Sequence, residues 1–308
     1  MQSFDECYRK VKFDCFKFIS KQETTAEKFR NKQKMLKTYL IPLCFWIVNK
    51  RFNKSKTLMI GLSGGQGSGK TTISSLISMI LKIYFNKKVF KISIDDFYKT
   101  RRERYDLSKN KHPLLKTRGV PGTHDIEMLL NFFNQLKNSK FKTFLLPKFD
   151  KSIDDRCKKN KWYKIKTRPD VVILEGWCVG AKPQNKKQLN RPINILEKKE
   201  DISAKWRQYV NFQLKTKYKR LFSQLENIIY LKAPSFNLLR FWRIKQEKKL
   251  KKNIKKNVTS KAMTNKEVLR FMMHYQRITL QMFKDMPNFA SVILTLNKFH
   301  NIKNIQLN

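Results

Sequence analysis

The sequence predicts an α/β fold in which a parallel five-stranded sheet carries helices on both faces. The first observation is a set of five short apolar runs, each as long as a buried strand: Thr57–Ser63, Val89–Ile94, Val171–Leu174, Ile228–Leu231 and Ser291–Leu296. The second is a set of intervening stretches whose apolar residues recur at helical spacing: Thr71–Ile83, Ile126–Leu136, Trp206–Phe222 and Val268–Ile278. Near-continuous apolar strands that alternate with helices are typical of a parallel sheet buried on both faces.

The first fifty or so residues have a different pattern, that of a charged amphipathic helix with a break at Pro42. We therefore expect an N-terminal helical segment over residues 1–54 and one larger domain over residues 55–308. A chain of 308 residues is long enough for such a domain to bury its own core.

The composition excludes several classes of protein. Hydrophobic residues make up 41% of the chain and aromatic residues 12%, which argues against global disorder. The longest apolar stretch, around Tyr39–Val48, is about half of the roughly twenty residues that a bilayer-spanning helix needs, so we expect no membrane partner. Acidic residues near the N-terminus interrupt any export signal, and the five cysteines are scattered without a CxxC spacing. These features favour a cytoplasmic protein without disulfides or a zinc site.

The net charge of +45, from 68 basic and 23 acidic residues, invites a nucleic-acid interpretation. A genome poor in G and C would produce the same excess of lysine whatever the function. The lysines are spread along the whole chain, and only Lys245–Lys256 is a dense run. We therefore favour compositional drift over a nucleic-acid partner.

Glycine is the more informative residue. Average usage would place roughly twenty glycines in a chain of this length, but there are nine. All nine fall in three short segments: Gly61–Gly69, Gly119–Gly122 and Gly176–Gly180. A glycine-poor chain keeps glycine where a side chain is not tolerated, so these segments are the places to look for ligand binding.

The first of these segments contains a phosphate-binding motif. Residues Gly64 to Thr71 fit the pattern GxxxxGK[ST] without departure, with a predicted strand before and a predicted helix after. Backbone N–H groups of such a loop converge on phosphate oxygens, which glycines leave accessible. Lys70 is expected to reach the β- and γ-phosphates and Thr71 to ligate Mg²⁺, so ATP and Mg²⁺ are the expected cofactors. The cofactor-binding residues are Gly64, Gly65, Gln66, Gly67, Ser68, Gly69, Lys70, Thr71 and Thr72.

Carboxylates follow the second and third predicted strands, at the edge where parallel sheets bind ligands. Asp95 and Asp96 follow the second strand, and one of them could orient an attacking hydroxyl and accept its proton. We favour Asp95 as this base and Asp96 as a helix cap or a supporting group. Glu175 ends the third strand, in the position of a carboxylate that meets Mg²⁺.

Together these residues resemble the phosphoribulokinase/uridine kinase group of P-loop kinases. Five further stretches are similar to its D-glycerate 3-kinase branch: Arg118–Asp125, Pro147–Ser152, Leu174–Trp177, Phe241–Glu247 and Met263–Arg277. The likeness runs from about Tyr39 to the C-terminus. Phe149 stands where the branch usually has Tyr, and the first forty residues match nothing in it. The resemblance implies phosphorylation of D-glycerate by ATP to give 3-phosphoglycerate.

Glycerate needs a cation for its carboxylate and hydrogen-bonding partners for its hydroxyls. Arg118 is the first candidate for the carboxylate, because a guanidinium binds it bidentately and the adjacent glycines shape a tight loop. Thr123 and His124 could add hydrogen bonds, although His124 could equally open the next helix. A second candidate group follows Pro147 and consists of Lys148, Asp150 and Lys151, unless this is a solvated loop.

A helical lid is expected over residues 235–262, after the fourth strand. Arg240 and Arg243 lie three residues apart and so on one face of this helix. By resemblance we expect Arg243 to act as a catalytic cation over the transferring phosphate; the alternative is an ordinary basic amphipathic helix.

These residues favour a small-molecule kinase over three other functions. A kinase for uridine, pantothenate or a sugar phosphate stays open as an alternative, as does a nucleic-acid-binding ATPase. The latter would want basic residues interleaved with stacking aromatics, which are not found. A non-catalytic scaffold is disfavoured because Lys70, Thr71, Asp95 and Glu175 form a complete set. Oligomeric state and the role of the N-terminal helices stay open.

Overall fold

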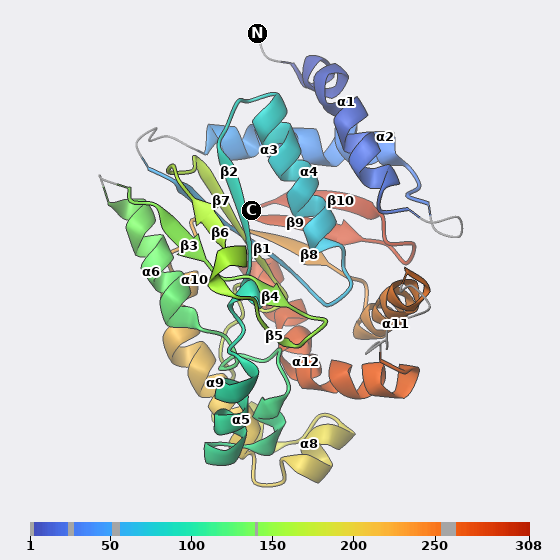
Figure 1. The fold of residues 1–308 in the computed structure, drawn as a ribbon. Coiled ribbons are helices and arrows are strands. Elements are labelled where there is room, and N and C mark those ends of the chain that lie inside the picture. The colour runs from blue at the N-terminus through green and yellow to red at the C-terminus, as the bar shows by residue number, and fades with distance from the viewer. Residues whose placement is uncertain (1–2, 24–27, 51–55, 139–140, 254–262) are drawn as a thin grey trace.

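The computed structural model describes residues 3–23, 28–50, 56–138, 141–253 and 263–308. Its main sheet has six strands in the order β10-β9-β8-β1-β7-β2. The strands of this sheet are β1 (Leu58–Gly64), β2 (Val89–Ser93), β7 (Val171–Gly176), β8 (Asn227–Lys232), β9 (Val292–Leu296) and β10 (Ile302–Leu307). The first five pair in parallel, as the five apolar runs predict, and β10 runs antiparallel to β9 (Figure 1).

The expected number of five strands is one too few. The sixth strand, β10, pairs with β9 at the edge of the sheet, and Ile302 is its only buried residue. An edge strand needs to bury little apolar surface, so this segment lacks the hydrophobic run that marks the other five.

Helices cover both faces of the sheet, and alternate residues of each strand point to opposite faces. Leu58 and Ile60 of β1 belong to one buried cluster with residues of α1, α3 and α4, whereas Met59 belongs to a second cluster with residues of α6, α9 and α12. Figure 1 shows the helices that surround the sheet. The long helices are α1 (Phe4–Ser20), α3 (Ile41–Asn49), α4 (Lys70–Ile83), α5 (Arg101–Asn110), α6 (Ile126–Lys137), α9 (Lys205–Gln213), α11 (Phe236–Asn253) and α12 (Asn265–Asp285). The short ones are α2 (Lys32–Lys34), α7 (Lys186–Asn190), α8 (Ile195–Glu200) and α10 (Lys219–Phe222).

The N-terminal helices belong to the same core as the sheet. Buried residues of α1 and α3 form one apolar cluster with β1 and α4, and Tyr84 at the end of α4 donates a 2.8 Å hydrogen bond to Glu6. The expected boundary between residues 54 and 55 lies outside the described residues. None of the helices in the described part of the chain has the length and apolar character that crossing a bilayer requires.

The predicted break at Pro42 is wrong. Pro42 lies in the first turn of α3, and the helix reaches it through a π-helical segment, Met35–Leu40, without interruption. In this segment the N–H of Ile41 bonds to the carbonyl of Leu36, five residues back. The wider π turn gives room for a proline ring that would collide with the preceding turn of a regular helix.

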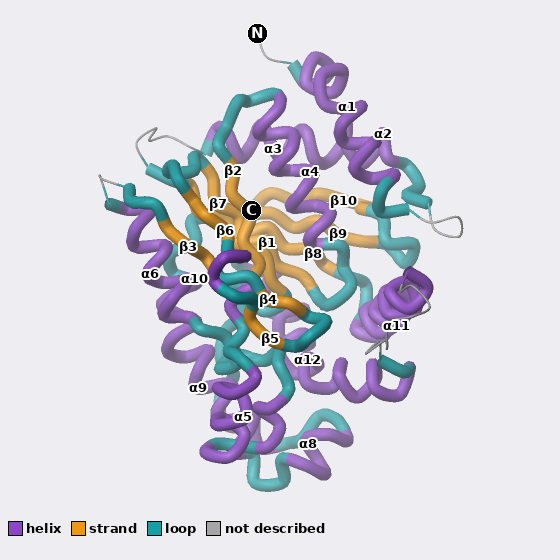
Figure 2. Tube along the Cα trace, in the orientation of Figure 1, coloured by secondary structure: helices purple, strands orange, loops and turns teal. Residues whose placement is uncertain are grey.

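Two short antiparallel ribbons fill the polar connection over residues 140–170. They pair β3 (Phe144–Leu146) with β6 (Tyr163–Ile165) and β4 (Phe149–Asp150) with β5 (Asp155–Arg156), outside the main sheet (Figure 2). The second ribbon carries the group that follows Pro147. The expected lid begins as α11, and residues 254–262 lie outside the described residues.

Candidate active site

The phosphate-binding loop connects the end of β1 to the first turn of α4. Gly69 is the residue before α4 and has φ +86°, a conformation in which a side chain would be strained. Gly67 has φ +79°, and a Cβ there would lie 3.2 Å from the backbone nitrogen of Arg243 in α11. Glycine is therefore required at Gly69 by the backbone conformation and at Gly67 also by the close approach of α11 to the loop.

Lys70 folds back over this loop. Its ammonium donates hydrogen bonds to the carbonyl oxygens of Gly64 at 2.8 Å and Gly65 at 3.0 Å. Burial lowers the pKa of Lys70 to about 8, although the carboxylates of Glu175 and Asp95 act to raise it. A phosphate group arriving at the loop would supply the negative charge that this ammonium lacks.

Thr71 and Glu175 meet at the carboxyl edge of the sheet. The hydroxyl of Thr71 donates to Glu175 Oε1 at 2.9 Å, and that of Ser74, one turn further along α4, donates to Oε2 at 2.7 Å. A hydroxyl and a carboxylate are the oxygen ligands that Mg²⁺ accepts when phosphate and water supply the rest. The described residues hold no cluster of three or more His, Cys, Asp or Glu that could bind a metal unaided. The Thr71 hydroxyl and the Glu175 carboxylate could supply two of the oxygen ligands of such an ion.

Asp95 lies in the 3₁₀ turn that follows β2, and it lines the same cleft as Lys70, Thr71 and Glu175. Tyr98 donates its hydroxyl to Asp95 Oδ1 at 3.0 Å, and the ammonium of Lys151 lies 2.7 Å from Oδ2. Burial acts to raise the pKa of Asp95, but the charge and hydrogen bond of Lys151 hold it well below the usual range. Asp96 accepts a hydrogen bond from the Phe149 N–H at 3.2 Å, and burial raises its pKa to about 6. This contact supports the β4–β5 ribbon.

Arg118 does not line the cleft that holds Asp95, and its guanidinium has a protein partner instead. Arg118 forms an ion pair with Asp154 and lies over the ring of Phe149, 5.6 Å from its centre. Thr123 is fully buried and shapes the loop: its hydroxyl donates to the carbonyl of Val120 at 2.7 Å and accepts from the Gly119 N–H at 3.1 Å.

His124 is stacked on Tyr98, with ring centres 4.4 Å apart, and its Nδ1 lies 2.6 Å from the Tyr218 hydroxyl. Burial lowers the pKa of His124 to about 4, so its imidazole is neutral at pH 7. Nε2 is buried without a hydrogen-bond partner. The alternative role for His124, opening the next helix, falls to Asp125, which caps that helix.

Of the three residues expected after Pro147, which are Lys148, Asp150 and Lys151, only Lys151 lines the cleft. Lys148 is exposed and lies over the ring of Tyr163, 5.8 Å from its centre, and Asp150 accepts hydrogen bonds from the backbone and side chain of Ser152. Neither lines the cleft, whereas Lys151 reaches it and pairs with Asp95.

Arg243 and Arg240 of α11, the helix where a lid was expected, also have protein partners. Arg243 lies 2.5 Å from Glu247 one turn along α11, and its guanidinium sits over the ring of Phe271. Arg240 donates to Gln276 of α12 at 3.4 Å. Trp242 lies between them and stacks on His300, with ring centres 4.1 Å apart.

The phosphate loop, Asp95, Lys151 and Glu175 line one open cleft of about 1440 Å³. Its outer wall includes residues of the N-terminal segment, which no motif in the sequence indicated: Phe18, Gln22, Lys28, Phe29 and Arg30. Lys249 of α11 donates to the backbone carbonyl of Gln22, so the lid helix contacts this segment. The hydrogen bond from Ser74 to Glu175 was not expected either. The position of Ser74, one helical turn after Thr71, is the signal that could have indicated it.

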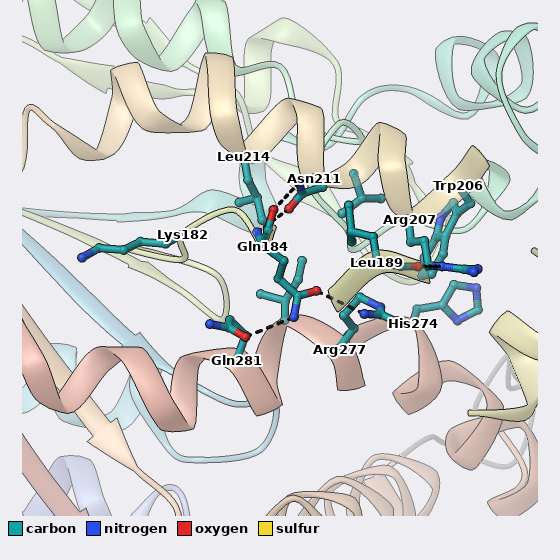
Figure 3. Close-up of a pocket in the computed structure, with 12 residues that line it drawn as sticks. Lys182, Gln184, Leu189, Trp206, Arg207, Asn211, Leu214, His274, Arg277 and Gln281 are labelled. Atoms are coloured by element: carbon teal, nitrogen blue, oxygen red, sulfur yellow. Dashed lines mark hydrogen bonds between the residues drawn. The ribbon is translucent and has the colours of Figure 1, made fainter. Parts of the chain in front are cut away.

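A second cavity, of about 20 Å³, lies elsewhere, between α9, α12 and the loop before α7 (Figure 3). Arg277 points across it to Gln184, which also bonds to Asn211 (Figure 3). Arg277 pairs with the fully buried Glu197 at 2.6 Å. None of the expected site residues lines this cavity, and its two arginines, Arg207 and Arg277, are paired with Asp201 and Glu197, so we assign it a structural role.

The chain resembles known kinases in sequence and in fold. The uncharacterized kinase mug58 of Schizosaccharomyces pombe is 33% identical over 256 residues, which are 80% of this chain and 85% of that protein. The chloroplastic D-glycerate 3-kinase of Arabidopsis thaliana is 32% identical over 164 residues, 47% of this chain and 35% of that protein. The pantothenate kinase of Streptococcus gordonii is 33% identical over 136 residues, 44% of this chain and 41% of that protein.

The solved D-glycerate 3-kinase of Cryptococcus neoformans shares the fold, with a TM-score of 0.71 and 24% identity over 87% of this chain and 97% of that one. No family model matches the sequence. The similarity to mug58 extends over four fifths of this chain, which places the two proteins in one family. The chain belongs to the family of P-loop kinases that includes mug58, and it is similar to the two D-glycerate 3-kinases described above.

Proposed function

We propose that this kinase transfers the γ-phosphate of ATP to a hydroxyl of D-glycerate and so forms 3-phosphoglycerate. One observation carries the proposal: Lys70, the Thr71–Glu175 pair and Asp95 come from three separate segments and line a single cleft. Kinase relatives with glycerate as their named substrate support the choice of acceptor.

The phosphate donor has a ready site in residues 64–72. The N–H groups of the loop and the start of α4 would bind the phosphates, with Lys70 between the β- and γ-phosphates. Thr71 and Glu175 would hold Mg²⁺, which when bound neutralises charge on the phosphate oxygens. Arg243 would add a positive charge from the lid after exchanging its partner Glu247 for the phosphate.

Asp95 would orient the acceptor. Its carboxylate accepts the proton of the acceptor hydroxyl while that oxygen forms a bond to the γ-phosphorus. The bond from the γ-phosphorus to the bridging oxygen breaks, and its electron pair leaves with ADP. Asp96, which accepts a hydrogen bond from the Phe149 N–H, would support the neighbouring ribbon instead.

The acceptor would lie between Asp95 and the loops that flank it. Neither Arg118 nor His124 lines the cleft itself: Arg118 would contribute positive charge from beside it, and His124 would act through Tyr98, on which it stacks and which is a partner of Asp95. Thr123 would act by shaping the Arg118 loop. Lys148 and Asp150 do not line the cleft either and would act through the turn that carries them.

An ADP-release screen across glycerate, pantothenate, uridine and ribulose 5-phosphate tests the proposal. We expect glycerate to stimulate ADP release most and the phosphorus NMR spectrum of the product to match 3-phosphoglycerate. A response to another acceptor with none to glycerate would overturn the substrate and leave the kinase reaction standing. Stimulation by RNA or DNA instead would overturn both.

Pantothenate is the second candidate acceptor, because a pantothenate kinase matches 44% of the chain at 33% identity. Pantothenate is also a hydroxy acid with a carboxylate, so the same screen separates the two.

For location we propose the cytoplasm, with which five free cysteine thiols are compatible.

A further inference from the structure

Lys151 occupies an unexpected position, since it forms an ion pair with the carboxylate proposed as the base. Its ammonium lies 2.7 Å from Asp95 Oδ2, while Tyr98 donates to the other oxygen. A base engaged in this way is poorly prepared to take a proton, because the cation stabilises its ionised form. The arrangement therefore fits a resting state of the site rather than the reacting one.

The two partners differ in how firmly they are held. The side chain of Asp95 is 19% exposed and sits in the turn after β2, whereas that of Lys151 is 60% exposed. The ribbon that carries Lys151 is anchored at several points: Asp96 accepts from Phe149, and Arg104 and Arg118 both pair with Asp154. The backbone of Lys151 is thus fixed beside the cleft while its long side chain is free to change partner.

The other basic side chains near the Asp95 carboxylate have different partners or are neutral. Arg118 is tied to Asp154, and Lys70 is held by the carbonyls of Gly64 and Gly65. His124 is buried and neutral. Among the described residues that line the cleft, Lys151 is the cation that contacts Asp95 directly.

We propose that Lys151 binds the negatively charged group of the acceptor and that this exchange frees Asp95. In the resting site the Lys151 ammonium is paired with Asp95. When an acceptor binds, the ammonium pairs with the acceptor carboxylate instead and leaves Asp95. A neutral polyol cannot pair with the ammonium, and therefore meets a base that is still paired. Lys151 thus makes the enzyme selective for anionic hydroxy acids. The inference rests on the proposed kinase function.

The test compares Lys151→Met with the wild-type protein, using glycerate and glycerol as acceptors. Glycerol replaces the carboxylate of glycerate with a neutral CH₂OH group. Lys159→Met, an exposed lysine on the same connection, serves as the matched control. We expect Lys151→Met to lower kcat/KM for glycerate by about 30-fold, the order expected for truncating one partner of a charge pair that the bound acceptor covers. We expect kcat/KM for glycerol to stay or rise, and Lys151→Arg to restore part of the preference for glycerate.

Equal losses with both acceptors, or a raised KM for ATP, would overturn the inference in favour of a structural or phosphate-binding role. Calorimetry of glycerate binding in the presence of a non-hydrolysable ATP analogue gives a second measurement that needs no turnover, and binding that survives in Lys151→Met also overturns it. If the acceptor screen identifies uridine, a neutral acceptor, the inference fails while the kinase function stands. If it identifies pantothenate, the same comparison is made with pantothenate and its alcohol analogue.

Discussion

The hydroxyl of Thr71 donates a 2.9 Å hydrogen bond to Glu175, although 104 residues separate the two along the chain. The contact exists because β1 and β7 are parallel neighbours, with Ser63 opposite Gly176, so the loop after one strand meets the end of the other. Ser74 satisfies the second carboxylate oxygen. The pair is thereby oriented toward the cleft before any ligand arrives.

We expect Glu175→Gln to reduce ADP release by about 100-fold and to shift the Mg²⁺ dependence to higher concentration, because an amide keeps the shape of the side chain and loses its charge. Mg²⁺ titrations of the steady-state rate measure both effects. Ser74→Ala is the control: it removes the neighbouring hydrogen bond and leaves Thr71 and Glu175 in place. A change of equal size in Ser74→Ala would mean that orientation, not metal charge, is what Glu175 contributes.

The phosphate loop, Asp95 and Glu175 could be predicted from the sequence because each directly follows an apolar run that marks a strand. The glycine-rich loop follows one apolar run, and Asp95 and Glu175 each follow another; parallel pairing then brings all three to one edge. The same logic fails for β10, which buries only Ile302 and so has no apolar run.

The acceptor side was harder to predict because its contacts depend on turns. Lys148 and Lys151 stand three residues apart in one polar connection, and only the pairing of β4 with β5 decides that Lys151 reaches Asp95. Likewise, nothing near Arg118 in the sequence indicates a partner at Asp154, 36 residues further on. The wall that Phe29 and its neighbours add to the cleft follows from the packing of the N-terminal helices, which resemble no known motif.

The second prediction concerns pH. Burial lowers the pKa of Lys70 to about 8, so its ammonium loses its proton as the pH rises through that value. The charged form is the one that binds phosphate, and kcat/KM reports the free enzyme; kcat/KM for ATP should therefore fall above about pH 8. Lys70→Arg should be less active but should lack this alkaline limb, because a guanidinium stays charged. A limb at the same pH in Lys70→Arg would assign it to another group.

The third prediction concerns Arg118 and its partner. We expect Arg118→Ala to raise the KM for glycerate at least tenfold more than the KM for ATP, because the change removes positive charge from the acceptor side and loosens the turn that holds Lys151. Asp154→Asn keeps the arginine but breaks the ion pair. A similar rise in Asp154→Asn would indicate that Arg118 acts by positioning the turn, whereas an unchanged KM there would indicate direct contact with the carboxylate. Equal effects on both substrates in Arg118→Ala would contradict any acceptor role.

The last prediction concerns the lid. Arg243 is paired with Glu247 at 2.5 Å, and Glu247 also accepts a 3.0 Å hydrogen bond from the backbone N–H of Met263, just before α12. Glu247 therefore keeps one partner if Arg243 leaves it for the phosphate. We expect Arg243→Met to slow single-turnover phosphoryl transfer by about 1000-fold, as loss of a transition-state arginine does, with ATP affinity changed only a few-fold. Glu247→Gln weakens the hold on the arginine and should slow transfer far less. Rapid-quench measurement of the product separates the step from ADP release, and equal slowing in both variants would show that the arginine supports the lid without reaching the phosphate.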